Sequence, residues 1–227
     1  MTITNWVLLG TLAVTLGLLI LSYILKKIVL QKICECIIIP VFAALNILLL
    51  RDYLPDSMHL IKVTIIALSL ATVSTIFMAL EKIKVLRILG RIFILANVFC
   101  WISLYRIVFY IHKVPLWLII LMTAIYIAGI VTAIILSGKQ EVRFYILFAL
   151  SFALSAYLHF CSLIFLCYEA TGHAVMLFSG TTLFAGLTGF HFINQAKLKI
   201  KHAGVIRYGL LVASQVLIAC SNILMIR

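Results

Sequence analysis

Residues 174–202 read AVMLFSGTTLFAGLTGFHFINQAKLKIKH, an apolar stretch that is long enough to cross a bilayer and that ends in a basic run. Small and polar residues occupy its middle: Ser179, Gly180, Thr181, Thr182, Gly186, Thr188, Gly189 and His191. Small residues let helices approach closely, and polar side chains at membrane depth need a partner that lipid cannot supply. The stretch therefore predicts a membrane-spanning helix in the interior of a bundle.

The composition of the whole chain extends this prediction. Of its 227 residues, 66% are hydrophobic and 11% are charged, whereas soluble domains average about 45–50% and about 25%. A spanning helix needs about 20 apolar residues, and eight candidate spans follow at 3–25, 28–50, 59–80, 88–111, 114–137, 143–167, 174–194 and 205–226. We expect an all-α polytopic membrane helix bundle of eight transmembrane helices, a single integral membrane domain over residues 1–227.

The basic residues predict an orientation. Most of the 18 Lys and Arg lie near the loops after the first, third, fifth and seventh spans: Lys26, Lys27, Lys32, Lys82, Lys84, Arg87, Arg91, Lys139, Arg143, Lys197, Lys199, Lys201 and Arg207. The positive-inside rule makes those loops cytoplasmic and puts both termini outside. We expect a bacterial cytoplasmic membrane, with anionic lipid headgroups and not nucleic acid as partners of the basic face.

The third and seventh spans share a pattern. Aligning Thr75 with Thr188 also aligns Lys84 with Lys197, nine residues later in each case. Both spans run in the same direction in the predicted topology. The pattern indicates a 4+4 parallel internal repeat, as found in some membrane proteins.

A few polar residues inside spans are candidates for function. Asn46 needs a hydrogen-bond partner at membrane depth, and a lone histidine such as His159 is more often bonded to a neighbouring helix than catalytic. Cys34 and Cys36 form a poor zinc motif because no second pair of ligands accompanies them, so packing is the favoured interpretation. The sequence predicts no metal and no cofactor.

The last two spans carry a family resemblance. Residues 180–188 read GTTLFAGLT and residues 214–218 read SQVLI. These resemble the G-A-x-L-F-x-x-S-D and A-Q-x-L-I motifs of the YhhN, lysoplasmalogenase-like family of eight-span membrane proteins. The resemblance implies hydrolysis of the vinyl ether of lysoplasmalogens, releasing a fatty aldehyde and a glycerophospho-alcohol.

The resemblance also identifies the candidate site residues. The two family aspartates fall on Thr75 and Thr188, the family histidine falls on Asn97, and Gln215 matches the family glutamine. His191 lies three residues after Thr188. Vinyl-ether hydrolysis needs a proton delivered to carbon, for which a carboxyl group of tuned pKa is suited and a threonine hydroxyl is not.

Three interpretations remain open. The first is a hydrolase whose acid has moved to His191 or His159, with Thr75, Asn97, Thr188, His191 and Gln215 around one cavity. The second is an inactive homologue that keeps a cavity for a membrane lipid or lysophospholipid. The third is a small transporter or scaffold whose polar residues line a path through the membrane. The sequence does not predict the oligomeric state.

Overall fold

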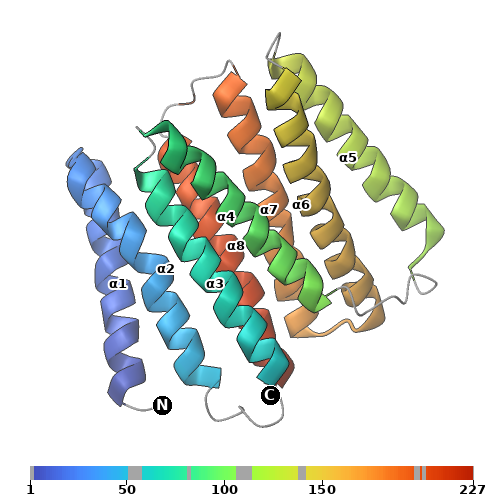
Figure 1. Cartoon of the computed structure of the whole chain (residues 1–227). Coiled ribbons are helices and arrows are strands. Elements are labelled where there is room, and N and C mark those ends of the chain that lie inside the picture. Colours follow the sequence, from blue (N-terminus) through green and yellow to red (C-terminus); the bar gives the residue numbers. More distant parts are fainter. Residues whose placement is uncertain are drawn as a thin grey trace. The chain divides into compact units, whose positions relative to one another are not determined.

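The computed structural model of the protein describes residues 3–50, 58–80, 83–105, 114–137, 142–196, 200 and 203–226. These residues form eight α-helices, which confirms the all-α prediction. The helices are α1 (Ile3–Ile24), α2 (Ile28–Leu50), α3 (Met58–Ala79), α4 (Lys84–Tyr105), α5 (Leu116–Ser137), α6 (Val142–Tyr168), α7 (Gly172–Ala196) and α8 (Ala203–Ile226) (Figure 1).

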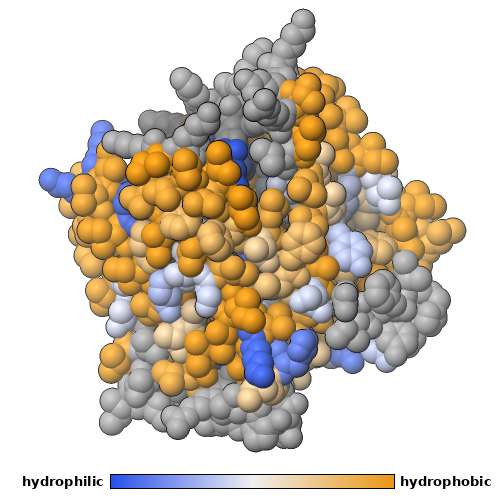
Figure 2. Space-filling model, viewed as in Figure 1, coloured by the Kyte–Doolittle hydropathy of each residue, from blue (hydrophilic) through white to orange (hydrophobic). Residues whose placement is uncertain are grey.

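Seven helices within the described ranges, α2 to α8, are long and apolar enough to cross a membrane. The apolar part of α1, Leu9–Ile24, is shorter. Apolar residues cover most of the described part of the face shown in Figure 2, and α5 exposes Leu116, Trp117 and Ile125 on different sides. Such exposure is unfavourable in water and suits lipid. This is the architecture of an integral membrane protein.

The chain divides into two compact units. Unit 1 comprises residues 1–104 and 222–227, and unit 2 comprises residues 105–221. Unit 1 therefore holds α1 to α4, except Tyr105 at the end of α4, with the last residues of α8, and unit 2 holds α5 to α7 with the rest of α8. The basic residues Arg51, Lys82, Arg106, Lys113, Lys139, Lys197, Lys199, Lys201 and Arg227 lie outside the described residues.

In unit 1, α1 ends at a left-handed cap centred on Lys26, whose φ is 54°. The Lys27 N–H donates to the Ser22 carbonyl at 2.8 Å, and the Lys26 N–H donates to the Tyr23 carbonyl at 3.2 Å. These bonds satisfy carbonyls at the end of α1 and reverse the chain into α2, which packs against α1. Glycine is the usual residue at such a position, because an L side chain is strained at positive φ.

Two hydrogen bonds set the register of α3 and α4 in unit 1. The Ser74 hydroxyl donates to the Gly90 carbonyl at 2.7 Å, and the Asn97 amide donates to the Ala67 carbonyl at 2.7 Å. Since the higher-numbered residue of α3 pairs with the lower-numbered residue of α4, the two helices run antiparallel. Ser74, Asn97 and Ala67 are all fully buried, so each bond replaces water that the helices exclude.

In unit 2, α7 approaches α8 closely at Gly180. A Cβ atom added there would lie 2.9 Å from Cγ1 of Ile218 and 3.1 Å from the Ile218 backbone nitrogen. The same addition at Gly186 or Gly189 would meet nothing within 4 Å. Of the three α7 glycines expected to allow close helix packing, Gly180 is therefore the one at the α8 contact.

Replacing Lys26 by glycine should raise the free energy of unfolding by about 1 kcal/mol, because glycine relieves the left-handed backbone conformation. Thermal unfolding of the purified protein in detergent measures the change. Lys27→Gly is the matched control, since it removes the same charge next to the cap at a residue with ordinary φ. An equal gain in both variants would assign the effect to charge and contradict the cap explanation.

Gly180→Ala should lower the free energy of unfolding by about 1–3 kcal/mol, because the new methyl group must displace the backbone of α8. Gly186→Ala on the same helix has open space around it and should be close to neutral. The two variants are compared by thermal unfolding in the same detergent. Equal stability of both variants would show that α7 and α8 do not meet at Gly180.

Candidate functional site

A row of hydrogen-bonding side chains runs along the contact between α6 and α7 in unit 2. We call this row the polar seam: Ser155, His159 and Ser162 of α6 with Thr181, Thr182 and Thr188 of α7. The α6 members recur at four- and three-residue spacing and so share one helix face. The α7 members belong to the stretch whose small and polar residues predicted a contact with other helices.

His159 is the centre of the polar seam and is 6% exposed. Its Nε2 lies 3.0 Å from the Thr182 hydroxyl, and its Nδ1 is hydrogen-bonded to the Tyr126 hydroxyl of α5. The interpretation of His159 as a histidine bonded to neighbouring helices is confirmed. Three helices of unit 2 therefore meet at one imidazole.

The hydrogen-bond partners of Thr182 determine the tautomer of His159. The Thr182 hydroxyl lies 2.7 Å from the Phe178 carbonyl, which can only accept, so its one hydrogen is used there. Towards His159 the Thr182 oxygen must accept, and Nε2 must carry the proton. A neutral imidazole then accepts at Nδ1 from the Tyr126 hydroxyl. Both nitrogens of His159 therefore have hydrogen-bond partners when the ring is uncharged.

The two ends of the polar seam follow the same pattern. Ser162 donates to the His159 carbonyl at 2.6 Å and lies 2.7 Å from the Thr181 hydroxyl. Ser155 donates to the Ser151 carbonyl at 2.8 Å and lies 2.9 Å from the Thr188 hydroxyl. One orientation of the hydroxyl hydrogens satisfies every member, with Thr181 donating to Ser162 and Thr188 donating to Ser155. The polar seam thus contains no net charge.

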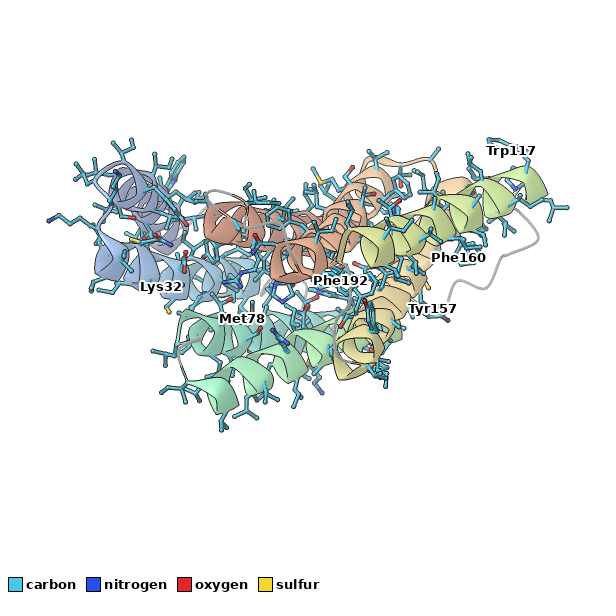
Figure 3. All side chains as sticks on the ribbon, turned by 90° about the horizontal axis from the view of Figure 1, so that it is seen from above. Lys32, Met78, Trp117, Tyr157, Phe160 and Phe192 are labelled. Carbon is cyan, nitrogen blue, oxygen red and sulfur yellow. The ribbon has the colours of Figure 1, made fainter. Side chains whose placement is uncertain are left out.

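Aromatic side chains pack beside the polar seam on the side of His159, while Thr182 is exposed. The Phe178 ring lies 4.7 Å from the His159 ring, and Tyr126 meets the edge of Phe152 at 5.5 Å between ring centroids. Phe192 of α7 lies on the side of the helix toward α6, where it stacks on Phe148 (Figure 3). These rings help to bury His159, and a low local dielectric strengthens the hydrogen bonds of a buried side chain.

The residues selected from the sequence fall into both units. Thr188 belongs to the polar seam, and His191 is half-buried one turn further along α7. Gln215 is fully buried on α8, two residues before the Leu217 that packs against Gly180. Gly180 and Thr188 are about 12 Å apart along α7 at the usual helical rise. Gln215 therefore lies nearer to the Gly180 level of unit 2 than to Thr188.

Thr75 and Asn97 are in unit 1 and are not bonded to each other. The Thr75 hydroxyl donates to the Ala71 carbonyl of its own helix at 2.8 Å, while Asn97 bonds to Ala67. Ala67 and Thr75 are eight residues apart on α3, or about 12 Å along its axis. The convergence of these two residues with Thr188, His191 and Gln215 on one cavity stays a prediction.

Glu35 of α2 is a buried acid that the site prediction did not include. It is 5% exposed, and it accepts a hydrogen bond from Gln31 at 2.7 Å and forms an ion pair with Lys32 at 3.2 Å. Among the described helices it is the one carboxyl group. An ionisable residue in a spanning segment is a functional candidate. Glu35 lies between Cys34 and Cys36, and the sequence pattern there was interpreted from the two thiols alone.

The described residues contain no group of three or more His, Cys, Asp or Glu side chains placed to hold a metal ion. No family model, curated protein or solved structure matches the chain. The resemblance to the YhhN family therefore stays a prediction from the motif residues.

Tyr126→Phe should lower the free energy of unfolding by about 1 kcal/mol, because hydrogen bonds between membrane helices contribute about 0.6–1.7 kcal/mol. The matched control is Thr123→Val on the same helix, whose exposed hydroxyl donates to its own Ile119 carbonyl. It should change stability little. Thermal unfolding in detergent compares the two, and a Tyr126→Phe variant no less stable than Thr123→Val would contradict the role of Tyr126 in the polar seam.

Proposed function

We propose that this protein is a divergent YhhN-like integral membrane protein that binds a lysophospholipid and does not hydrolyse it. One observation carries the proposal: the hydroxyl hydrogens at the two family aspartate positions are both used in hydrogen bonds within the protein. The Thr75 hydroxyl donates to the Ala71 carbonyl at 2.8 Å, and the Thr188 hydroxyl donates to Ser155 at 2.9 Å. A hydroxyl held in this way offers no proton to a substrate carbon.

The chemistry of the polar seam supports binding over hydrolysis. General-acid catalysis requires a group that gives up a proton near the working pH. The polar seam consists of hydroxyls and a neutral imidazole whose two nitrogens are both bonded to protein side chains. A substrate would have to displace Tyr126 or Thr182 to reach that imidazole.

A hydrolase with a relocated acid is the second candidate, and Glu35 is the observation that favours it. A carboxyl group buried in a membrane-length helix is the kind of acid that vinyl-ether hydrolysis needs. Against this role, the Glu35 carboxylate is already paired with Lys32 and Gln31. His191 remains the other candidate acid from the sequence.

We also propose eight spans with a 4+4 repeat, in a bacterial cytoplasmic membrane with both termini outside. The first residues of α1 and the last residues of α8 lie at the same end of unit 1 (Figure 1), which supports a common side for the two termini. The alignment of Thr75 with Thr188 also places Ala67 on Gly180. Ala67 bonds to α4, and Gly180 packs on α8, so equivalent small residues serve equivalent contacts.

The test combines binding and turnover on the purified full-length protein in detergent. A lysoplasmalogen at about a hundred times its dissociation constant should stabilise the protein by about 2.7 kcal/mol, with no fatty aldehyde released. Glu35→Gln and His191→Ala are assayed beside the wild type. Aldehyde release lost in either variant would establish a hydrolase with that acid. Absence of both binding and release would favour the transporter or scaffold and contradict the proposal.

A further inference from the structure

Asn46 of α2 is a buried amide with unmet hydrogen bonds. It is 1% exposed and belongs to the buried face of α2, together with Ile38, Ile39 and Leu45. Neither its Nδ2 nor its Oδ1 has a hydrogen-bond partner among the described residues. Leaving both ends of an amide unpaired in a protein interior is costly.

The position of Asn46 within unit 1 follows from its neighbours. Leu49, one turn further along the same face of α2, packs against Ile61 of α3 and Ile223 of α8. Since the end of α2 meets the start of α3, the two helices run antiparallel. One turn inward from this contact, Asn46 on α2 and Thr64 on α3 come to the same level.

A second amide meets Thr64 from α8. Asn222 is fully buried, and its Nδ2 donates to the Thr64 hydroxyl oxygen at 2.9 Å. The Thr64 hydroxyl accepts that bond and keeps its own hydrogen to donate. Asn46, Thr64 and Asn222 all belong to unit 1, and together they bring two amides and a hydroxyl to one level of α2, α3 and α8.

The donors and acceptors of this group select a ligand chemistry. A hydroxyl oxygen beside Asn46 would accept from the Asn46 Nδ2 and from the Thr64 hydroxyl, and it would donate to the Asn46 Oδ1. Three bonds are the number that a buried water usually makes. A carboxylate cannot donate to Oδ1, and an ammonium group cannot accept from Nδ2.

We propose that Asn46, Thr64 and Asn222 form a buried site in unit 1 for a neutral hydroxyl group. The hydroxyl belongs either to an internal water or to the alcohol group of a membrane amphiphile. The site goes beyond the function proposed above, because it lies outside the polar seam and requires neither hydrolysis nor a family relationship.

Radiolytic hydroxyl-radical labelling of the full-length protein in detergent tests the water source, because radicals formed from a bound water modify the side chains beside it. Leu45 and Ile61 should be labelled at least about three times faster than the equally buried Ile38 and Ile39 if an ordered water occupies the site. Asn46→Leu should reduce labelling of Leu45 and Ile61 to the level of Ile38. Thr64→Val, which keeps the side-chain shape, is the second variant and should also reduce it.

Thermal unfolding with added glycerol monooleate tests the amphiphile source. If a lipid alcohol occupies the site, labelling stays low, and glycerol monooleate raises the melting temperature of the wild type. Its dimethyl ether, which has no hydroxyl, should not raise it, and Asn46→Leu and Thr64→Val should lose the response. Control-level labelling together with no hydroxyl-dependent shift would overturn the proposal. Fast labelling that persists in both variants would overturn it as well.

Discussion

The hydrogen bonds of His159 connect α5, α6 and α7 of unit 2. Lipid offers no donors or acceptors, so every polar side chain at membrane depth must find its partner within the protein. His159 of α6 meets this requirement by accepting from α5 and donating to α7. A shift of any one of the three helices would leave a buried polar atom unpaired, which makes this arrangement of α5, α6 and α7 specific.

The same constraint acts in both units. In unit 1, Ser74 and Asn97 of one helix bond to backbone carbonyls of the next, and the Asn222 amide of α8 donates to the Thr64 hydroxyl of α3. In unit 2, side chains bond to side chains across α6 and α7. A network of hydroxyls and a neutral imidazole has all its protons committed to partners. Such a network suits the recognition of a group without net charge better than the transfer of a proton.

The sequence predicted the helices well because length and apolar composition decide them, and the small and polar residues of α7 predicted its contact with other helices. It could not predict which hydroxyls cross between helices. Ser74 and Thr75 are neighbours of similar chemistry, yet Ser74 bonds to α4 and Thr75 bonds to its own helix. The outcome depends on helix rotation, which tertiary packing sets. The left-handed cap at Lys26 could not be predicted from the sequence either, because the usual sequence signal for such a cap is glycine.

Nitrogen-15 solid-state NMR of the imidazole of His159, in protein reconstituted into bilayers at pH 7.5, measures directly whether this ring is neutral and which nitrogen carries its proton. The resonances are assigned by their loss in His159→Gln. The ring should be neutral, with a protonated Nε2 and an unprotonated Nδ1, because Thr182 can only accept and Tyr126 donates. A doubly protonated ring, or a proton on Nδ1 instead of Nε2, would contradict the closed and uncharged polar seam.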